Sequence, residues 1–332
     1  MVRDPLCSST AVSRDARARG RGLSRRRRRG RTPLRRLLAT ADVRFVNLES
    51  TLSEQGGETG SPHNQLVFTG PPAGAAALGR AGIDVVSLAN NHAWDYGRDA
   101  LLETMDHLDR AGIAYVGAGR TRQDAYGPRV VARAGFRVAF VAVTDIWNQG
   151  FDPHPGKELV ADASEESLLA AVRAARALRA VDAVLVSYHG GEEYLAEPRE
   201  RQERLLRAAI DAGADVVLGH HPHVVQRVDF YRGKPIFYSL GNLLMRMKTG
   251  EPWTEFGMLA RLVLGRGGAA VSVEICPFRI FGLDPVPLAA DPKRRPYEAL
   301  FRFKYGLLLR GPAAARMGEL GADGCARLLP PG

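Results

Sequence analysis

The chain has 332 residues, and 45% of them are hydrophobic, so it is long enough for one large α/β domain or two smaller ones. The formal net charge of +10 is concentrated at one end, because residues 1–40 hold thirteen arginines against Asp4 and Asp15. That segment carries +11 and the rest of the chain −1, so we expect no nucleic-acid partner for the folded part. No run of 18 apolar residues is present, which predicts no membrane span.

The first 33 residues are rich in arginine, with Arg25 to Arg29 in one run, and show little apolar periodicity. This composition predicts a disordered tail. The tail is either an arm for an anionic surface or a non-native leader translated from an upstream start codon. We favour the leader, because 41 arginines against 5 lysines indicate GC-rich coding DNA.

The N-terminus is positively charged but has no apolar segment after it, so it is not a recognisable secretory signal. Taken alone, this predicts a cytoplasmic protein. The cysteines Cys7, Cys276 and Cys325 are widely spaced, without a CxxC pair. They predict neither a disulfide framework nor a thiolate metal site.

Strands and helices alternate along the chain. Apolar runs predict strands at 43–46, 83–88, 114–116, 183–187, 214–218 and 235–238. Helices are expected at 72–82, 97–110, 165–180 and 198–212, the third of them capped by Asp162 and Glu165. Hairpins are expected at 129–134 with 137–143, and at 259–264 with 270–275. This order predicts an α/β fold, a layered β-sheet core flanked by helices.

Three histidines follow the predicted strand 214–218, in the stretch Gly219-His220-His221-Pro222-His223. His221 and His223 are two residues apart, so in an extended segment both rings project to the same side. Neutral imidazole nitrogen is a good ligand for zinc, manganese and iron. The alternative is a loop with three solvated histidines.

Polar side chains also follow the other predicted strands. They are Asn47, Glu49, Asn90, Asn91, His92, Asp95, His189, Glu193, Ser239 and Asn242. Carboxylate, amide and imidazole groups without thiolate favour borderline or hard divalent ions such as manganese, zinc or iron. Two such ions about 3.5–4 Å apart can support in-line attack on a phosphoryl or acyl centre, while a nearby histidine protonates the leaving group.

Several of these stretches resemble motifs of the CapA-type capsule synthesis proteins, over about residues 36–280. The motifs are Asn47-Leu48-Glu49, Ala89-Asn90-Asn91-His92 with Asp95 and Gly97, His189-Gly190-Gly191-Glu192-Glu193-Tyr194, Gly213-Ala214-Asp215 through His223-Val224-Val225-Gln226, and Tyr238-Ser239-Leu240-Gly241-Asn242. This family is linked to poly-γ-glutamate synthesis, and its fold is similar to that of the calcineurin-like metallophosphoesterases. The resemblance therefore implies a metallophosphoesterase-like core.

The resemblance also implies a role for each residue. Glu49 would be the bridging carboxylate, and Asn91, His189, His221 and His223 would be metal ligands. His92 would face the substrate as general acid. Residues expected to orient the ligands or close the pocket are Asn47, Asn90, Asp95, Glu193, His220 and Asn242. From the residues alone, Asn90 could instead brace a turn and Asp95 could cap the helix after it.

Family members usually begin with a strand ending in Gly-Asp, whose aspartate is a metal ligand. The Arg-rich segment stands at that place here, so the expected fold lacks this first strand and the second of two metal positions is in doubt. We expect three regions: a tail at 1–33, a CapA-like domain at 34–282 and a C-terminal extension at 283–332.

The function implied by the resemblance is metal-dependent synthesis or processing of a surface polymer such as poly-γ-glutamate. The reaction would be hydrolysis or transfer at an amide or a phosphoester. The alternative is a non-catalytic accessory component of a polymer-synthesis complex. The expected partners are the polymer or its synthesis machinery, which suggests association with the cell envelope.

Overall fold

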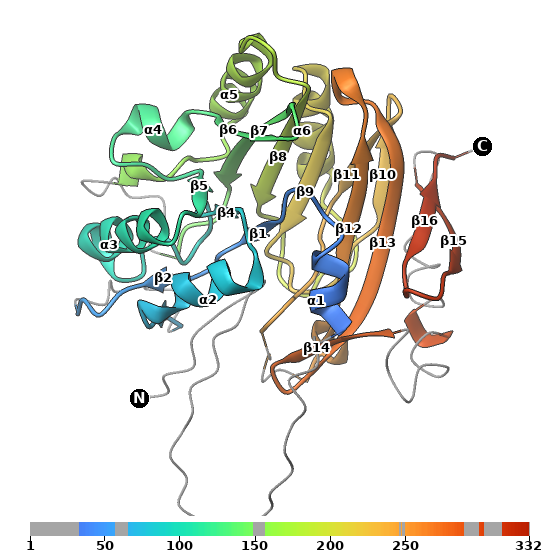
Figure 1. The fold of residues 1–332 in the computed structure, drawn as a ribbon, viewed down its shortest axis with the longest axis horizontal. Coiled ribbons are helices and arrows are strands. Elements are labelled where there is room, and N and C mark those ends of the chain that lie inside the picture. The colour runs from blue at the N-terminus through green and yellow to red at the C-terminus, as the bar shows by residue number, and fades with distance from the viewer. Residues whose placement is uncertain are drawn as a thin grey trace, which may run out of the picture.

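The computed structural model describes residues 33–56, 66–148, 157–245, 247, 250–288, 299–301 and 314–331. The predicted tail at 1–33 therefore lies almost wholly outside the described residues. Within them, strands and helices form stacked layers, which confirms the predicted layered α/β fold (Figure 1).

The central layer is a sheet of six described strands in the order β10-β11-β9-β8-β7-β6. Its strands are β6 (Arg129–Arg133), β7 (Phe136–Thr144), β8 (Ala183–His189), β9 (Val216–His220), β10 (Val228–Tyr231) and β11 (Lys234–Phe237). The four inner strands β7, β8, β9 and β11 run parallel, and β6 and β10 pair antiparallel at the two edges. Both faces of the sheet are buried, which explains the continuous apolar runs in the sequence.

Alternate residues of β7 enter two different hydrophobic clusters. Ala139, Val141 and Val143 pack with apolar residues of α5 (Glu165–Ala177) and α6 (Glu200–Asp211). The helix α5 begins at the N-cap Ser164, which accepts a hydrogen bond from the Ser167 amide. The expected cap by Asp162 and Glu165 is therefore wrong, because Asp162 instead accepts a hydrogen bond from the Tyr126 hydroxyl.

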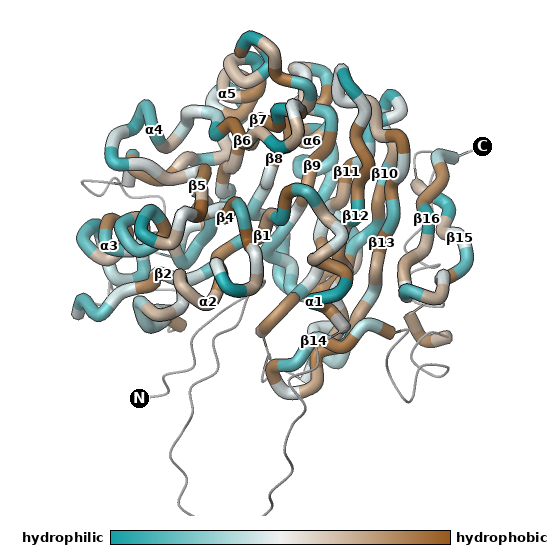
Figure 2. Tube along the Cα trace, in the orientation of Figure 1, coloured by the Kyte–Doolittle hydropathy of each residue, from teal (hydrophilic) through white to brown (hydrophobic). Residues whose placement is uncertain are grey.

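A second, parallel sheet has the order β1-β4-β5 and supplies the other half of the site. Its strands are β1 (Phe45–Asn47), β4 (Val85–Ser87) and β5 (Ala114–Val116). Beside it lie α2 (Ala73–Ala81), α3 (Gly97–Arg110) and the short pair β2 (Thr51–Leu52) with β3 (Thr69–Gly70). In Figure 2, α3 is largely hydrophilic, as expected of a helix that turns only one face inward. The rings of Phe45 and Phe140 stack 5.4 Å apart and join the two sheets.

The C-terminal part forms a third sheet, ordered β12-β13-β16-β15 with β14 paired to β13. Its strands are β12 (Phe256–Leu264), β13 (Ala270–Phe281), β14 (Asp284–Pro287), β15 (Arg316–Leu320) and β16 (Ala326–Leu329). The remaining elements are α1 (Pro33–Leu38), α4 (Arg122–Tyr126), η1 (Lys157–Leu159), η2 (Pro252–Glu255) and η3 (Arg266–Gly268). The predicted hairpin of β12 and β13 is present, whereas β14, β15 and β16 have no counterpart in the sequence analysis.

A disulfide joins Cys276 to Cys325. The prediction from cysteine spacing is therefore wrong for this pair. The two residues are 49 positions apart, but β13 and β16 pair antiparallel with Ile275 opposite Ala326, which brings the two cysteines together. Spacing along the chain does not reveal such a contact.

In the described part of the chain, no helix has both the length and the apolar composition needed to cross a bilayer.

The parallel strands end at the same level. Thr144 at the end of β7 is in register with His189 of β8, and His189 is in register with His220 of β9. In the second sheet, Asn47 at the end of β1 is in register with Ser87 of β4. Loops that leave these carboxyl ends therefore converge, which is where layered α/β folds place their sites.

Candidate metal centre

A buried carboxylate and two buried imidazoles form the middle of the site. Glu49, His221 and His223 each offer one ligand atom, and these atoms lie within 4.8 Å of one another. The Glu49 Oε1 atom is 3.7 Å from His189 Nε2 and 4.0 Å from His223 Nε2. The sequence analysis expected these four residues to act together, and the fold brings them together from three strand ends.

The loop after β9 is not extended, contrary to the sequence interpretation. His221 has φ of 100° and His223 has φ of 59°, both in the left-handed region. Such a backbone costs on the order of 1–3 kcal/mol per non-glycine residue and persists only where the surroundings hold it. Here it turns both rings toward the centre, with their centroids 5.9 Å apart.

Asn242 fixes the ring of His223. Its Oδ1 atom lies 2.9 Å from His223 Nδ1 and accepts the ring proton there. Its Nδ2 atom donates to the backbone oxygens of His223 and Thr254, so the amide has one orientation. His223 Nε2 is thereby left facing Glu49, which is the arrangement expected of a residue that orients a ligand.

His189 connects the two halves of the centre. Its Nε2 atom lies 2.8 Å from Asn91 Oδ1, and Asn47 Nδ2 lies 3.4 Å from its Nδ1 atom. Asn47 also donates to Glu49 Oε2 at 3.1 Å. Asn91, an expected ligand, thus has its amide oxygen at the centre.

Asn90 braces the turn that carries Asn91 and His92. Its Oδ1 atom accepts from the His92 amide, and its Nδ2 atom donates to Leu48 O and to Asn47 Oδ1. The bracing role considered from the sequence is therefore present. Because the same side chain contacts Asn47, it also ties the turn to the residue that holds Glu49.

His92 is paired with Asp95, and both are buried. Asp95 Oδ2 accepts a hydrogen bond from His92 Nδ1 at 2.5 Å and another from the Phe68 amide at 2.7 Å. The Phe68 ring lies against the imidazole, with centroids 4.0 Å apart. Asp95 does not cap the following helix, since the N-cap of α3 is Tyr96, without a side-chain cap bond. Its carboxylate contacts the His92 ring instead.

Asn148 belongs to this network, and the sequence analysis missed it. It follows the end of β7, in a stretch that matches none of the quoted motifs. Its Oδ1 atom accepts from Asn91 Nδ2 at 2.9 Å, and its Nδ2 atom lies 3.1 Å from both Asp95 Oδ1 and His92 Nδ1. The one available signal was its place just beyond a strand end, like the other members.

Two imidazoles of the centre, His189 and His221, are neutral at pH 7. Burial, followed by the charges of neighbouring imidazoles, holds the pKa of His189 well below its ordinary value of 6.5. The same causes lower the pKa of His221 to about 3. Neutral imidazole has the free electron pair that a metal ligand needs.

The donor set fits a divalent metal. Among the described residues, the Nδ1 atom of His221 is buried without a hydrogen-bond partner. Burying such an atom costs free energy unless it acquires a partner. One carboxylate, three imidazoles and an amide oxygen at one place make a mixed nitrogen and oxygen set, which suits zinc, manganese or iron.

Two expected site residues, Glu193 and His220, differ in their surroundings from the others. Glu193 is exposed, and it interacts with Tyr194 rather than with an expected ligand. His220 ends β9 with its ring 6.3 Å from that of Phe45, and burial lowers its pKa to about 4. The structure thus gives no support for a ligand-orienting role of Glu193.

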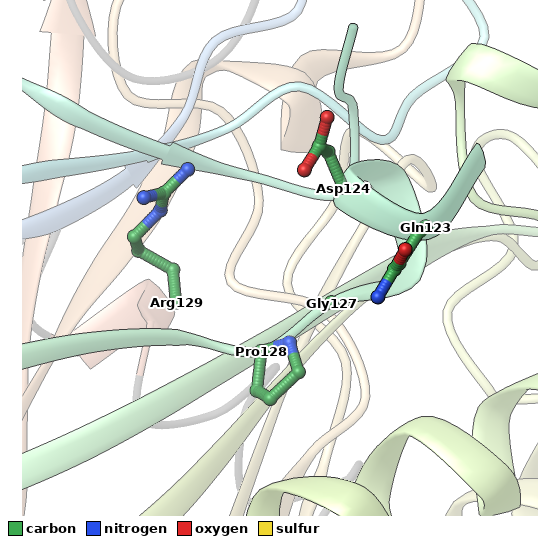
Figure 3. Close-up of a pocket in the computed structure, with 5 residues that line it drawn as sticks. All are labelled: Gln123, Asp124, Gly127, Pro128 and Arg129. Carbon is green, nitrogen blue, oxygen red and sulfur yellow. The ribbon is translucent and has the colours of Figure 1, made fainter. Parts of the chain in front are cut away.

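A separate cavity of about 260 Å³ is lined by Gln123, Asp124, Gly127, Pro128 and Arg129. Figure 3 shows these residues around α4 and the start of β6. It shares no residue with the centre, and Asp124 is occupied in the capping box of α4 with Thr121. This cavity is therefore separate from the buried centre.

Known proteins were compared with this chain. The family described as "Bacterial capsule synthesis protein PGA_cap" matches residues 12–247. The chain belongs to this family. The resemblance inferred from the motifs is thereby confirmed.

Two similar proteins illustrate the relation. "PGA biosynthesis protein CapA" of Bacillus subtilis (strain 168) is 34% identical over 208 residues, which cover 62% of this chain and 53% of that protein. "Capsule biosynthesis protein CapA" of Bacillus anthracis is 35% identical over 227 residues, covering 68% and 54% respectively. The chain thus spans about half the length of these relatives.

Solved structures similar to this PGA_cap protein include the calcineurin-like phosphoesterase YfkN from Bacillus subtilis. It is 12% identical, with a TM-score of 0.40, over 70% of this chain and 73% of that chain.

Proposed function

We propose that this PGA_cap protein is a metal-dependent protein that acts in the synthesis or processing of a capsule or surface polymer such as poly-γ-glutamate. Its reaction is hydrolysis or transfer at an amide or a phosphoester of the polymer or a precursor. Family membership and the names of the two CapA relatives support a role in making such a polymer. The partners we propose are the polymer and the machinery that makes it.

The observation that carries the metal-dependent part is the buried group of Glu49, His221 and His223. Together with Asn91 and His189 it would hold divalent ions, two in the full form of the proposal. A bound ion of this kind polarises a phosphoryl or carbonyl oxygen and lowers the pKa of water. The protein itself supplies the buried setting and the fixed orientation of each ligand.

His92 is the proposed proton donor. Because its Nδ1 proton is held by Asp95, the Nε2 atom is the one left to exchange a proton with a substrate. The Phe68 ring and the Asp95 carboxylate hold the imidazole plane, so the proton is delivered in one direction. An oxygen or nitrogen leaving group is the expected acceptor.

Metal content of the purified full chain, measured by elemental analysis after incubation with Mn²⁺ or Zn²⁺, tests the centre. We expect stoichiometric metal in the unmodified chain and none in the double variant His221→Ala, His223→Ala. The matched control is His107→Ala, because His107 lies on α3 and pairs with Glu103 at 3.1 Å, outside the centre. Full metal content in the double variant would show that the ligands were assigned wrongly.

Turnover is tested on a phosphodiester and on a γ-glutamyl amide, each with and without Mn²⁺. We expect hydrolysis of one of them, and a loss of about 10²–10⁴-fold in His92→Gln if His92 supplies the proton. A chain that binds metal and turns over neither substrate would contradict the hydrolytic proposal and favour an accessory role in the polymer-synthesis complex.

A further inference from the structure

Asn148 lies between the expected metal ligands and the His92–Asp95 pair. Its side chain is only 6% exposed. It accepts from Asn91 Nδ2 on one side and donates to Asp95 Oδ1 on the other.

The segment that carries Asn148 is anchored to the strand that supplies His189. The Asp145 amide donates to His189 O at 2.8 Å, so the end of β7 stays attached to the end of β8. Thr144 Oγ1 donates to Ile146 O at 3.0 Å and stabilises the turn that follows. The position of Asn148 is therefore set by the same sheet that positions a ligand.

The hydrogen bonds define a direction along this chain of groups. An ionised carboxylate only accepts, so Asp95 Oδ1 takes the Nδ2 end of Asn148. The Oδ1 end of Asn148 is then directed at Asn91 and takes its Nδ2 end. Asn91 Oδ1 is consequently left facing His189 Nε2 at 2.8 Å. A flipped Asn91 amide would present a donor, which cannot bind a cation.

We propose that Asn148 is a positioning residue: it sets the orientation of the Asn91 carboxamide so that its oxygen faces the metal, and it couples that orientation to Asp95. The expected effect on metal binding rests on the proposed metal function. The orientation of the Asn91 amide does not, because it is present without a metal. Removing a residue that hydrogen-bonds to a metal ligand commonly weakens metal affinity about 10–100-fold.

Two variants separate orientation from packing. Asn148→Leu removes both hydrogen bonds, whereas the carboxyl group of Asn148→Asp keeps an oxygen that accepts from Asn91 and shares one proton with Asp95, because two buried carboxylates this close do not both ionise. In competition titrations with a Mn²⁺ chelator, we expect affinity about 10–100-fold weaker in Asn148→Leu and within about threefold of the unmodified chain in Asn148→Asp. An unchanged affinity in Asn148→Leu, or an equal loss in both variants, would overturn the proposal.

A measurement without metal keeps the inference separate from the proposed function. Asparagine-selective ¹⁵N labelling, with Asn91→Asp to assign the signal, reports the side-chain amide of Asn91. We expect its protons to be protected from exchange in the unmodified chain and in Asn148→Asp, and to lose protection in Asn148→Leu. If the unmodified chain bound no metal, the proposed function would fail. The exchange of the Asn91 amide protons would then be the only test of the orientation. If the Asn91 amide protons stayed protected from exchange in Asn148→Leu, the proposed positioning role of Asn148 would be overturned.

Discussion

At the scale of residues, three imidazoles in and beside the centre stay neutral at pH 7 because they are buried. Burial lowers the pKa of His189, His220 and His221, the last two to about 4 and about 3. In the unfolded chain each has its ordinary value of about 6.5. The folded protein therefore excludes protons that the unfolded chain takes up at mildly acidic pH.

This difference makes stability depend on pH. Since the folded-state pKa values lie below the unfolded value, their contribution is fully present above pH 6.5 and is lost as the pH falls from about 6.5 toward 4 and 3. We expect the free energy of unfolding of the metal-free protein, measured in urea with EDTA, to fall by up to about 1.4 kcal/mol per pH unit for each such imidazole.

A variant isolates one of these groups. His220→Gln removes a titrating imidazole that is not an expected ligand. Unfolding of the variant should therefore take up about one proton fewer at acidic pH, and its unfolding free energy should depend less steeply on pH. The comparison is made between pH 7.5 and pH 5. An identical slope in the variant and the unmodified chain would contradict a neutral, buried His220.

At the scale of elements, the loop after β9 depends on a close approach between two strands. Gly219 lies where β9 passes the end of β11, and a Cβ atom there would be 2.0 Å from Tyr238 O. Only glycine fits without displacing backbone. The next residues, His221 and His223, can reach the centre because the two strand ends come this close.

We expect Gly219→Ala to lower the free energy of unfolding by about 1–3 kcal/mol, as overpacking does in a buried core. It should also weaken metal binding, since the histidine loop starts at this point. Urea unfolding and metal titration measure the two effects.

The matched control is Gly56→Ala. Gly56 has nothing within 4 Å of an added Cβ and no left-handed backbone, so stability should change by less than about 0.5 kcal/mol. A Gly219→Ala protein as stable as this control would show that the strands can separate at no cost.

At the scale of the whole molecule, a disulfide between Cys276 of β13 and Cys325, just before β16, cross-links two strands of the C-terminal sheet. That bond closes a loop of 49 residues. It restricts the unfolded chain, and cross-links of this kind stabilise the folded state by roughly 2–4 kcal/mol.

Reduction with dithiothreitol should therefore lower the free energy of unfolding by roughly 2–4 kcal/mol. The double variant Cys276→Ala, Cys325→Ala is the control, because dithiothreitol should not change its stability. The metal centre draws on β1, β8 and β9, so we expect metal content to survive reduction. A loss of metal on reduction would show that the C-terminal sheet supports the centre.

The sequence by itself determined the order of strands and helices and the polar residues at the strand ends. The helix 97–110 and the strand 114–116 occur as predicted, and Gly82 ends α2 in the left-handed conformation. These features are encoded locally, because the spacing of apolar residues and a glycine at a helix end determine the structure of only a few neighbouring residues. Glu49, His221 and His223, whose candidate ligand atoms lie within 4.8 Å of one another, were also singled out from the sequence, since each follows a recognisable strand.

Only the tertiary structure decided which distant groups meet. Asn148 joined the site, and Cys325 met Cys276, because strand pairing brings together segments that share no local pattern. The backbone of His221 and His223 is left-handed rather than extended, since the approach of β9 to β11 sets the path of that loop. Hydrogen-bond direction, as in the Asp95–Asn148–Asn91 chain, likewise exists only once all three side chains are buried together.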